Sequence, residues 1–201
     1  MAEPIERHGA PKPRPPLPES LDARQRARRD RIVMATVELL PRTEYEQLQM
    51  KEVTAAAGVA LGTTYRYFNS KEHLVAEALL VWAMQFAREP VVQEGRTVDR
   101  VKVAYHRAVR AFELNPCVYG HMSAVQGSSD PRVREIFDLF GSGQLDAFAI
   151  YLARVPNPRR DRVIAVMNAV LGDNLRQWAL GRKSIEDVHA AIDSAAELLV
   201  A

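Results

Sequence analysis

The 201-residue sequence contains little cysteine, little net charge and no long apolar run. Cys117 is its only cysteine, which excludes an intrachain disulfide and a multi-cysteine metal site and fits a reducing compartment. The longest uninterrupted apolar runs, residues 78–84 and 147–153, are seven residues each, whereas a bilayer-spanning helix needs about 20. The N-terminus also lacks the apolar core of a secretory signal. These absences predict a cytoplasmic protein that makes no membrane contact.

Acidic and basic side chains nearly balance, with 27 Lys and Arg against 25 Asp and Glu and a net charge of +2. This balance excludes a uniformly cationic protein that coats nucleic acid, so any contact with DNA must come from local clustering. One cluster is an arginine run interrupted by a single acid, Asp30, and it comprises Arg24, Arg26, Arg28, Arg29 and Arg31. Taken alone, such a run is typical of a solvated helix face.

Helical periodicity dominates the chain after residue 20, and no segment alternates with the period of two that a strand requires. The first twenty residues hold six of the twelve prolines and are expected to form a disordered tail. The rest predicts an all-α fold of about nine helices separated by short breaks rich in Pro and Gly. The expected helices span residues 21–40, 50–57, 61–68, 70–88, 97–114, 116–126, 131–154, 160–180 and 184–200, and residues 155–161 are expected to form a loop.

Two of these helices, 50–57 and 61–68, are too short to be stable alone and meet at Gly58. Gly58 provides a sharp turn, Ala57 permits close approach, and Val59 fills the angle between the helices. This pattern predicts a helix-turn-helix motif that presents its second helix to DNA. The alternative is that Gly58 only ends a helix and the two short helices form a packing corner.

The second short helix has two different faces. Thr64 and Phe68, four residues apart, are expected to face the core. The N-terminal end is expected to face base edges through Leu61, Gly62 and Thr63, and because Gly62 has no side chain the backbone can approach DNA there. The hydroxyls of Tyr65 and Tyr67 are expected to contact phosphates.

The run from Val59 to Leu74 reads Val-Ala-Leu-Gly-Thr-Thr-Tyr-Arg-Tyr-Phe-Asn-Ser-Lys-Glu-His-Leu and resembles the signature of the TetR family of transcriptional regulators. The resemblance covers about residues 21–74 closely. It implies a DNA-binding domain over residues 21–70 and a larger helical domain for effector binding and dimerisation over residues 71–201. The DNA contacts that it implies are Lys51, Leu61, Gly62, Thr63, Tyr65, Tyr67 and Lys71.

Beside such a motif, the arginine run, including Arg28, is expected to meet phosphate or the minor groove. The chain departs from the family at two positions: Gln49 and Ala60 stand where many members have Thr and Ser. Hydroxyl capping is therefore missing at the start of both short helices, and phosphate contacts there are in doubt.

Aromatic and sulfur-containing residues in the second domain are expected to line an apolar effector cavity, with a few polar side chains to orient the ligand. The expected lining residues are Trp82, Phe86, Tyr105, Phe112, Met122, Phe148, Asn174 and Trp178, and the polar candidates are His106, His121, Asn168 and Asn174. Taken alone, each of these residues is expected to belong to the core, and only together do they indicate a cavity. Segments 45–51, 61–63 and 174–178 are similar to a sterol-catabolism repressor of the same family, which implies a sterol-related or acyl-type effector.

The last two helices carry wide apolar stripes, and small residues on the last one permit close approach of a partner helix. We expect them to form a homodimer through a four-helix bundle that includes Val170, Ile192, Ala195 and Leu199. A two-fold dimer would bind a palindromic operator in double-stranded DNA.

No residue spacing indicates a metal, a cofactor or a catalytic site, although Cys117 and His121 lie four apart on one helix. The sequence therefore predicts a ligand-responsive, DNA-binding repressor that is not an enzyme. The alternatives are an all-α enzyme or a helical adaptor without DNA binding.

Overall fold

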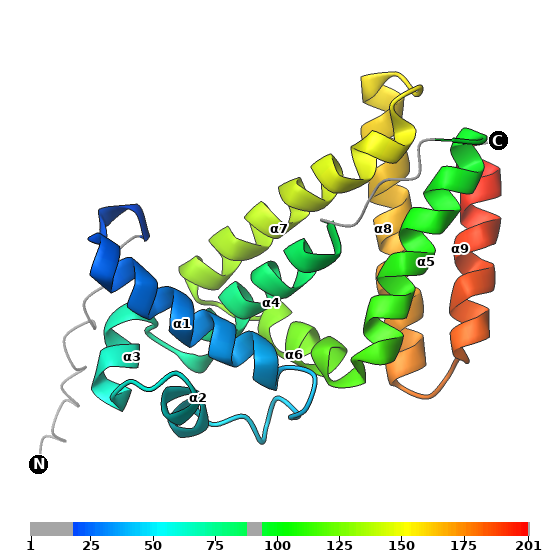
Figure 1. Ribbon diagram of the computed structural model, residues 1–201. Coiled ribbons are helices and arrows are strands. Elements are labelled where there is room, and N and C mark those ends of the chain that lie inside the picture. The colour runs from blue at the N-terminus through cyan, green and yellow to red at the C-terminus, as the bar shows by residue number, and fades with distance from the viewer. Residues whose placement is uncertain (1–17, 88–93, 201) are drawn as a thin grey trace, which may run out of the picture.

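A computed structural model describes residues 18–87 and 94–200, excluding the side chains of residues 86, 87 and 140–147. Within these ranges the chain forms α-helices, short 3-10 helices and no strand, so the all-α prediction is confirmed and every expected helix is present (Figure 1). The described helices include none that is long and apolar enough to cross a membrane. The helices are η1 (Pro18–Ser20), α1 (Ala23–Leu39), α2 (Met50–Ala56), α3 (Leu61–Tyr67), α4 (Lys71–Ala87), α5 (Thr97–Leu114), α6 (Pro116–Gln126), α7 (Pro131–Ala149), η2 (Ile150–Leu152), α8 (Asn157–Ala179) and α9 (Ile185–Val200).

Two helix boundaries differ from the sequence prediction. Helix α8 begins at Asn157, inside the segment 155–161 that we expected to be a loop. Pro156 is the N-cap and Pro158 lies in the first turn, where the missing N–H of a proline leaves no hydrogen bond unmade. The expected helix 131–154 is not continuous either, because α7 tightens into the 3-10 turn η2 after Ala149.

Helix ends elsewhere follow the local sequence. The Ser70 hydroxyl accepts a hydrogen bond of 3.1 Å from the backbone N–H of His73 at the start of α4. Ser184 and Asp187 form a reciprocal capping box at α9, with hydrogen bonds of 3.0 and 3.1 Å. Gly181 has φ 67° just after α8, the left-handed conformation that commonly ends a helix. Each of these helix ends is therefore explained by residues next to it in the sequence.

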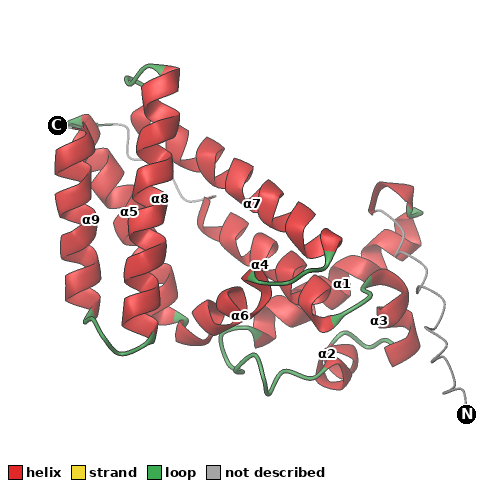
Figure 2. Ribbon diagram, turned by 180° about the vertical axis from the view of Figure 1, so that it is seen from behind, coloured by secondary structure: helices red, strands yellow, loops and turns green. Residues whose placement is uncertain are grey.

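The helices divide into two groups in space (Figure 1). Helices α1, α2 and α3 gather at one end of the molecule, and α5, α8 and α9 lie side by side at the other. Helix α4 leaves the first group and runs beside α7, while α6 lies below α4, between the two groups (Figure 2). Helices α4, α6 and α7 therefore connect the two ends of the molecule.

Candidate nucleic-acid interface and effector cavity

The turn between α2 and α3 has the geometry that the sequence predicts. Gly58 adopts φ 63°, a left-handed conformation that costs glycine little. Val59 follows, and its N–H donates a 3.0 Å hydrogen bond to the carbonyl of Thr54 on α2. Thr64 and Phe68 are fully buried, so they fix α3 against the core as expected. The two short helices are therefore stabilised by tertiary packing, which compensates for their length.

The opposite face of α3 is open to solvent. Leu61 is 43% exposed and Tyr65 is 47% exposed, so both side chains are accessible on one short helix. Gly62 is exposed, Thr63 is half-buried, and Lys51 on α2 is exposed. An added Cβ at Gly62 would have no neighbouring atom within 4 Å, so a DNA backbone could approach here. These five residues are accessible to solvent, and their contact with DNA stays a prediction.

Tyr67 is placed differently from the prediction of a phosphate contact. Its side chain is only 2% exposed, and its hydroxyl is buried without a hydrogen-bond partner in the described structure. Tyr67 lies on the packed side of α3 with Thr64, three residues earlier, whereas Tyr65 points outward. In this conformation the phenol of Tyr67 cannot reach a phosphate.

Lys71 is also engaged within the protein rather than free to bind phosphate. Its ammonium donates hydrogen bonds of 2.5 Å to the carbonyl of Tyr45 and 3.1 Å to the carbonyl of Leu48. It also lies 4.0 Å from the ring centroid of Tyr45, a cation–π distance. Burial and the charge of Glu72 raise the pKa of Tyr45 to about 12, so this phenol stays protonated. Lys71 therefore ties the start of α4 to the loop that precedes α2.

The arginine run on α1 separates into exposed and buried members. Arg24 and Arg31 are exposed, and Arg28 is half-buried, so these three remain available to a polyanion. Arg29 is 8% exposed, pairs with Glu77 on α4 and lies 5.2 Å from the ring centroid of Phe68. The expectation of a phosphate contact is therefore wrong for Arg29, because its position on the helix turns it toward the core.

A chain of buried and half-buried polar groups extends from Arg29 along α4. Burial alone would raise the pKa of Glu77, but the hydrogen bond with His73 and the charge of Arg29 outweigh it, so the pKa lies below its usual value. The Nδ1 atom of His73 is 2.8 Å from Oδ1 of Asn69, and the Asn69 amide donates a 2.9 Å hydrogen bond to Asp130 before α7. The network fixes the turn between α3 and α4 against both α1 and α7.

An apolar cavity lies between α4, α5, α6 and α7. Its volume is about 10 Å³, room for about one water molecule, whereas small-molecule sites measure roughly 300–1,000 Å³. Three of the expected effector residues line it: Trp82, Phe112 and Met122. The complete lining is Ala76, Leu79, Trp82, Phe112, Met122, Ile136 and Phe137. The cavity is thus in the expected place but nearly closed.

The other expected lining residues lie elsewhere. Tyr105 and Phe148 stack on each other with ring centroids 4.2 Å apart, so they fill space instead of bordering it. Trp178 packs against the core away from the cavity lining, and the side chain of Phe86 lies outside the described residues. Tyr105, Phe148 and Trp178 are therefore core residues in this conformation and do not line the cavity.

Each polar residue that was expected to orient a ligand in the cavity is instead hydrogen-bonded to another group of the protein. Asn174 donates to the carbonyl of Val170 at 2.8 Å and accepts from Lys183 at 2.6 Å. Asn168 accepts a 2.9 Å hydrogen bond from the Tyr105 hydroxyl. Asn174 breaks the apolar stripe of α8 because it joins α8 to the following loop. The expectation that Asn174 contacts an effector is therefore not supported.

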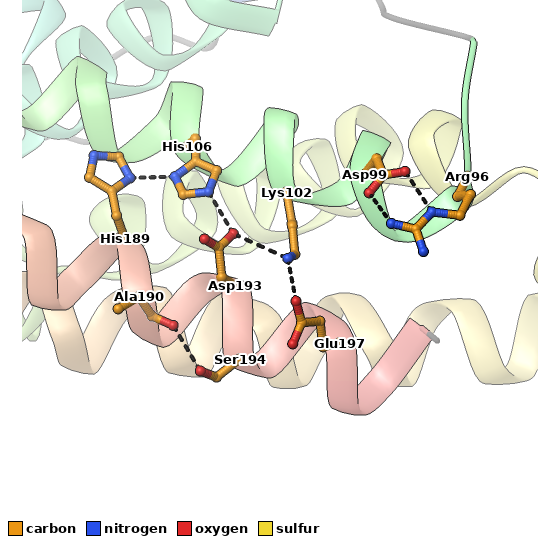
Figure 3. Close-up of polar contacts among 9 residues, drawn as sticks. All are labelled: Arg96, Asp99, Lys102, His106, His189, Ala190, Asp193, Ser194 and Glu197. Carbon is orange, nitrogen blue, oxygen red and sulfur yellow. Dashed lines mark hydrogen bonds and ion pairs between the residues drawn. The ribbon is translucent and has the colours of Figure 1, made fainter.

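The two histidine handles are engaged as well. Figure 3 shows His106 on α5 between two side chains of α9, with its Nδ1 facing His189 and its Nε2 2.8 Å from Asp193. Lys102 extends this cluster to Glu197 at 2.6 Å. His121 on α6 is fully buried and bonds outside the cavity, as described below. These groups hold α5 to α9 and α6 to its neighbours.

The expected dimer residues fall into two classes. Val170, Ala195 and Leu199 are half-buried at the edge of the core, which leaves part of each side chain open to a partner. Ile192 is fully buried within its own subunit. The assignment of Ile192 to a dimer face is therefore wrong, because α9 turns this position toward α5 and α8.

Comparisons with known proteins agree with this arrangement. Residues 32–78 match the family model described as bacterial regulatory proteins, tetR family. The HTH-type transcriptional repressor KstR of Mycolicibacterium smegmatis is 31% identical over 88% of this chain and 88% of its own. The crystal structure of a TetR transcriptional regulator from Rhodococcus sp. RHA1 superposes with a TM-score of 0.70 and 29% identity, covering 87% of this chain and 96% of the other.

A further solved structure has the same fold at lower identity. FadR from Bacillus subtilis, in complex with stearoyl-CoA, has a TM-score of 0.64 and 20% identity, with 86% of this chain and 97% of that chain covered. The identity and coverage of the KstR match show that the protein belongs to the TetR family. It is a DNA-binding transcriptional regulator and not an enzyme.

Proposed function

We propose that this protein is a homodimeric repressor that binds a palindromic operator and is released by a small, largely apolar effector. The observation that carries the proposal is the open face of α3. Leu61 and Tyr65 are exposed there, and their exposure has no structural benefit for the free protein. A recognition helix in the major groove would use them, together with Thr63, to contact bases and phosphates.

Exposed cationic side chains also lie on α1 and α2, the helices that pack with α3. Lys51, Arg24 and Arg31 are exposed and would neutralise phosphates without reading sequence. We propose DNA contacts from Lys51, Leu61, Gly62, Thr63, Tyr65 and Arg28, and we leave out Tyr67 and Lys71 for the reasons given above. Such a regulator acts in the cytoplasm, where bacterial DNA lies.

The effector would enter the cavity between α4 and α7. Its lining residues are all apolar, which supports a ligand with a large apolar part, of the sterol-related or acyl type that the family resemblance implies. Because the cavity is nearly closed, a ligand of that size must displace the surrounding helices. An effector would therefore favour a helix arrangement different from this one.

The dimer would form through the outer faces of α8 and α9. Leu198 on α9 is 86% exposed and Val166 on α8 is 45% exposed, although both helices pack inward with their other faces. Exposed alanines lie beside them at positions 165, 169 and 190, so a partner helix could approach closely. Two helices from each subunit would then close a four-helix bundle about a two-fold axis.

A binding assay tests the DNA and effector parts of the proposal together. Fluorescence anisotropy should show tight binding to a duplex from the region upstream of the protein's own gene, and weaker binding to a scrambled duplex of equal length. Addition of stearoyl-CoA or of a soluble sterol should release the specific duplex. Equal affinity for both duplexes would contradict the proposal, and binding that neither compound affects would contradict the effector class.

A further inference from the structure

One face of α6 contacts the loop that leads into α2. The imidazole of His121 donates from Nε2 to the carbonyl of Thr43 at 2.7 Å, and its ring lies edge-on to the Tyr45 ring with centroids 5.8 Å apart. One turn earlier, the Cys117 thiol donates to Glu44 at 3.3 Å. Because Cys117 and His121 are four residues apart, both project from one side of the helix. A single helix face thus binds three consecutive residues of the loop.

The neighbouring residue of α6 lines the effector cavity. Met122 lies directly after His121 and borders the cavity together with Trp82 and Phe112. Tyr119, on the same helix, contacts Phe112 edge-on with centroids 6.2 Å apart. A change in cavity volume that displaces α6 would therefore displace His121 as well, because His121 and Met122 belong to the same turn of one helix.

The loop is also bonded from its other side, where Lys71 binds the carbonyls of Tyr45 and Leu48 as described above. Within the loop, the N–H groups of Gln47 and Leu48 donate to the carbonyl of Glu44 at 3.1 and 3.0 Å. The next residue is the N-cap of α2. Residues 43–48 thus form a bonded turn with α6 on one side, Lys71 on the other and α2 at its end.

We propose that His121 is a positioning residue for DNA binding, which holds the loop between α1 and α2 in register and transmits movement of α6 to the recognition helices. This inference rests on the proposed function, because it assigns a route to the effector response. Helix α4 is joined to α3 through the chain itself, whereas this second route passes from α6 to the loop through side-chain contacts. When α6 shifts, the hydrogen bond to Thr43 must either pull the loop or break, and both outcomes release α2 from its position.

Two features make His121 the central contact. It is fully buried, so its hydrogen bond to the backbone is shielded from water and costly to leave unmade. Its Nδ1 atom has no partner in the described structure, so the side chain bonds to the loop alone. The Cys117 contact is weaker because Glu44 is exposed and the donor is a thiol.

Amide hydrogen exchange on the full-length protein tests the holding contact without DNA. His121→Phe keeps a ring of similar size and removes the donor, and Ser123→Ala changes an exposed side chain of α6 as its control. We expect exchange of amides 43–50 to accelerate by about tenfold in His121→Phe, with the control unchanged. Unchanged exchange in both variants would overturn the proposal.

A second pair of variants guards against a folding defect in His121→Phe. Glu44→Ala removes the acceptor of the Cys117 contact, and Glu46→Ala makes the same charge change on the same loop at a residue that is also exposed. Both remove one negative charge near DNA, so their electrostatic effect on binding is matched. Faster exchange and weaker duplex binding in Glu44→Ala than in Glu46→Ala would support the proposal, and identical behaviour would count against it.

The transmission step needs a displacement of α6. Ala76→Leu enlarges a side chain that lines the cavity and should push its walls outward, because a closed cavity cannot hold the added carbons. It should accelerate exchange of amides 43–50 in the presence of His121 and have a much smaller effect in the His121→Phe background. Equal acceleration in both backgrounds would place the route elsewhere. Leu79→Phe repeats this comparison at the same wall if Ala76→Leu does not fold. If the unmodified protein fails to bind DNA, the proposed function fails, while the exchange results still decide the contact.

Discussion

Thr63 is the side chain whose loss should change base discrimination most. It lies half-buried at the N-terminal end of α3, and its hydroxyl and methyl groups can both contact a base edge. Thr63→Ala should cost about 1–3 kcal/mol in binding to the correct operator and little in binding to random DNA. Anisotropy titrations with an operator duplex and a scrambled duplex measure both values. A parallel loss on the two duplexes would identify Thr63 as a phosphate contact instead.

The two lysines of the motif should behave differently although the family resemblance gives them the same role. Lys51 is exposed, so Lys51→Ala should reduce the slope of log affinity against log salt by about one without changing stability. Lys71 donates to two carbonyls of the loop before α2, and Lys71→Ala leaves them unbonded. We expect Lys71→Ala to lower the free energy of unfolding by about 1–3 kcal/mol, measured by urea denaturation.

The salt dependence of DNA binding by Lys71→Ala shows whether this assignment of Lys71 is wrong. If its salt slope falls as much as that of Lys51→Ala and its stability is unchanged, then Lys71 leaves the loop and binds phosphate in the complex.

At the scale of the helix, α6 should make stability depend on pH through His121. Burial lowers the pKa of His121 below its usual 6.5, and the charge of Lys71 adds to this, while the bond to Thr43 and the charge of Glu44 oppose it. The unfolded chain therefore binds the proton more readily than the folded chain. The stabilising contribution is complete above about pH 6.5 and is lost as the pH falls below that value.

Urea unfolding between pH 5 and pH 8 measures this dependence. Below pH 6.5 the free energy of unfolding of the unmodified protein should fall by up to about 1.4 kcal/mol per pH unit because of His121. The free energy of unfolding of His121→Phe should fall less steeply. Burial also lowers the pKa of His189, so the difference between the two proteins isolates His121. Parallel pH profiles would show that the pKa of His121 is the same in the folded and the unfolded states.

The helices could be predicted from the sequence because each helix end depends on residues close to it along the chain. Gly58 needs a positive φ, and Ser70 and Ser184 cap the helices that follow them, whatever the rest of the chain does. The start of α8 was mispredicted because Pro156 was interpreted as a helix breaker, although proline is equally suited to a first turn. Spacing along one helix gives a face but does not determine which neighbour covers it.

The candidate site was harder to predict for the same reason. Arg29 and Arg31 look alike in the sequence, yet only Arg29 meets Glu77, a residue of α4 that lies 48 positions away. His121 was recognised as a polar candidate, but its partner is a backbone carbonyl in a loop. Every residue has such a carbonyl, so the sequence does not show which one is bonded. Contacts of this kind depend on tertiary packing and become visible only in three dimensions.

At the scale of the whole molecule, the dimer should depend on the outer edge of α9. Ala195 is half-buried at the edge of the proposed seam, so Ala195→Glu would place a charge between two packed helices. We expect monomers with near-normal helicity and little operator binding, since a single recognition helix cannot hold two half-sites. Sedimentation velocity, circular dichroism and anisotropy measure these three properties.

Leu139→Glu serves as the control for that experiment. Leu139 is 60% exposed on α7, outside the proposed seam, and its substitution should leave the dimer intact. If Ala195→Glu also remains dimeric, the subunits associate through another surface.

The nearly closed cavity has a consequence for the speed of the response. Because the cavity has space for about 10 Å³, the proposed effector would enter only during the moments when the surrounding helices have separated. The observed binding rate should then rise with effector concentration and level off at the rate of helix opening, while the apparent affinity is reduced by the small fraction of open molecules. The time that the regulator needs to leave its operator would be set by its own internal motion, however abundant the effector becomes.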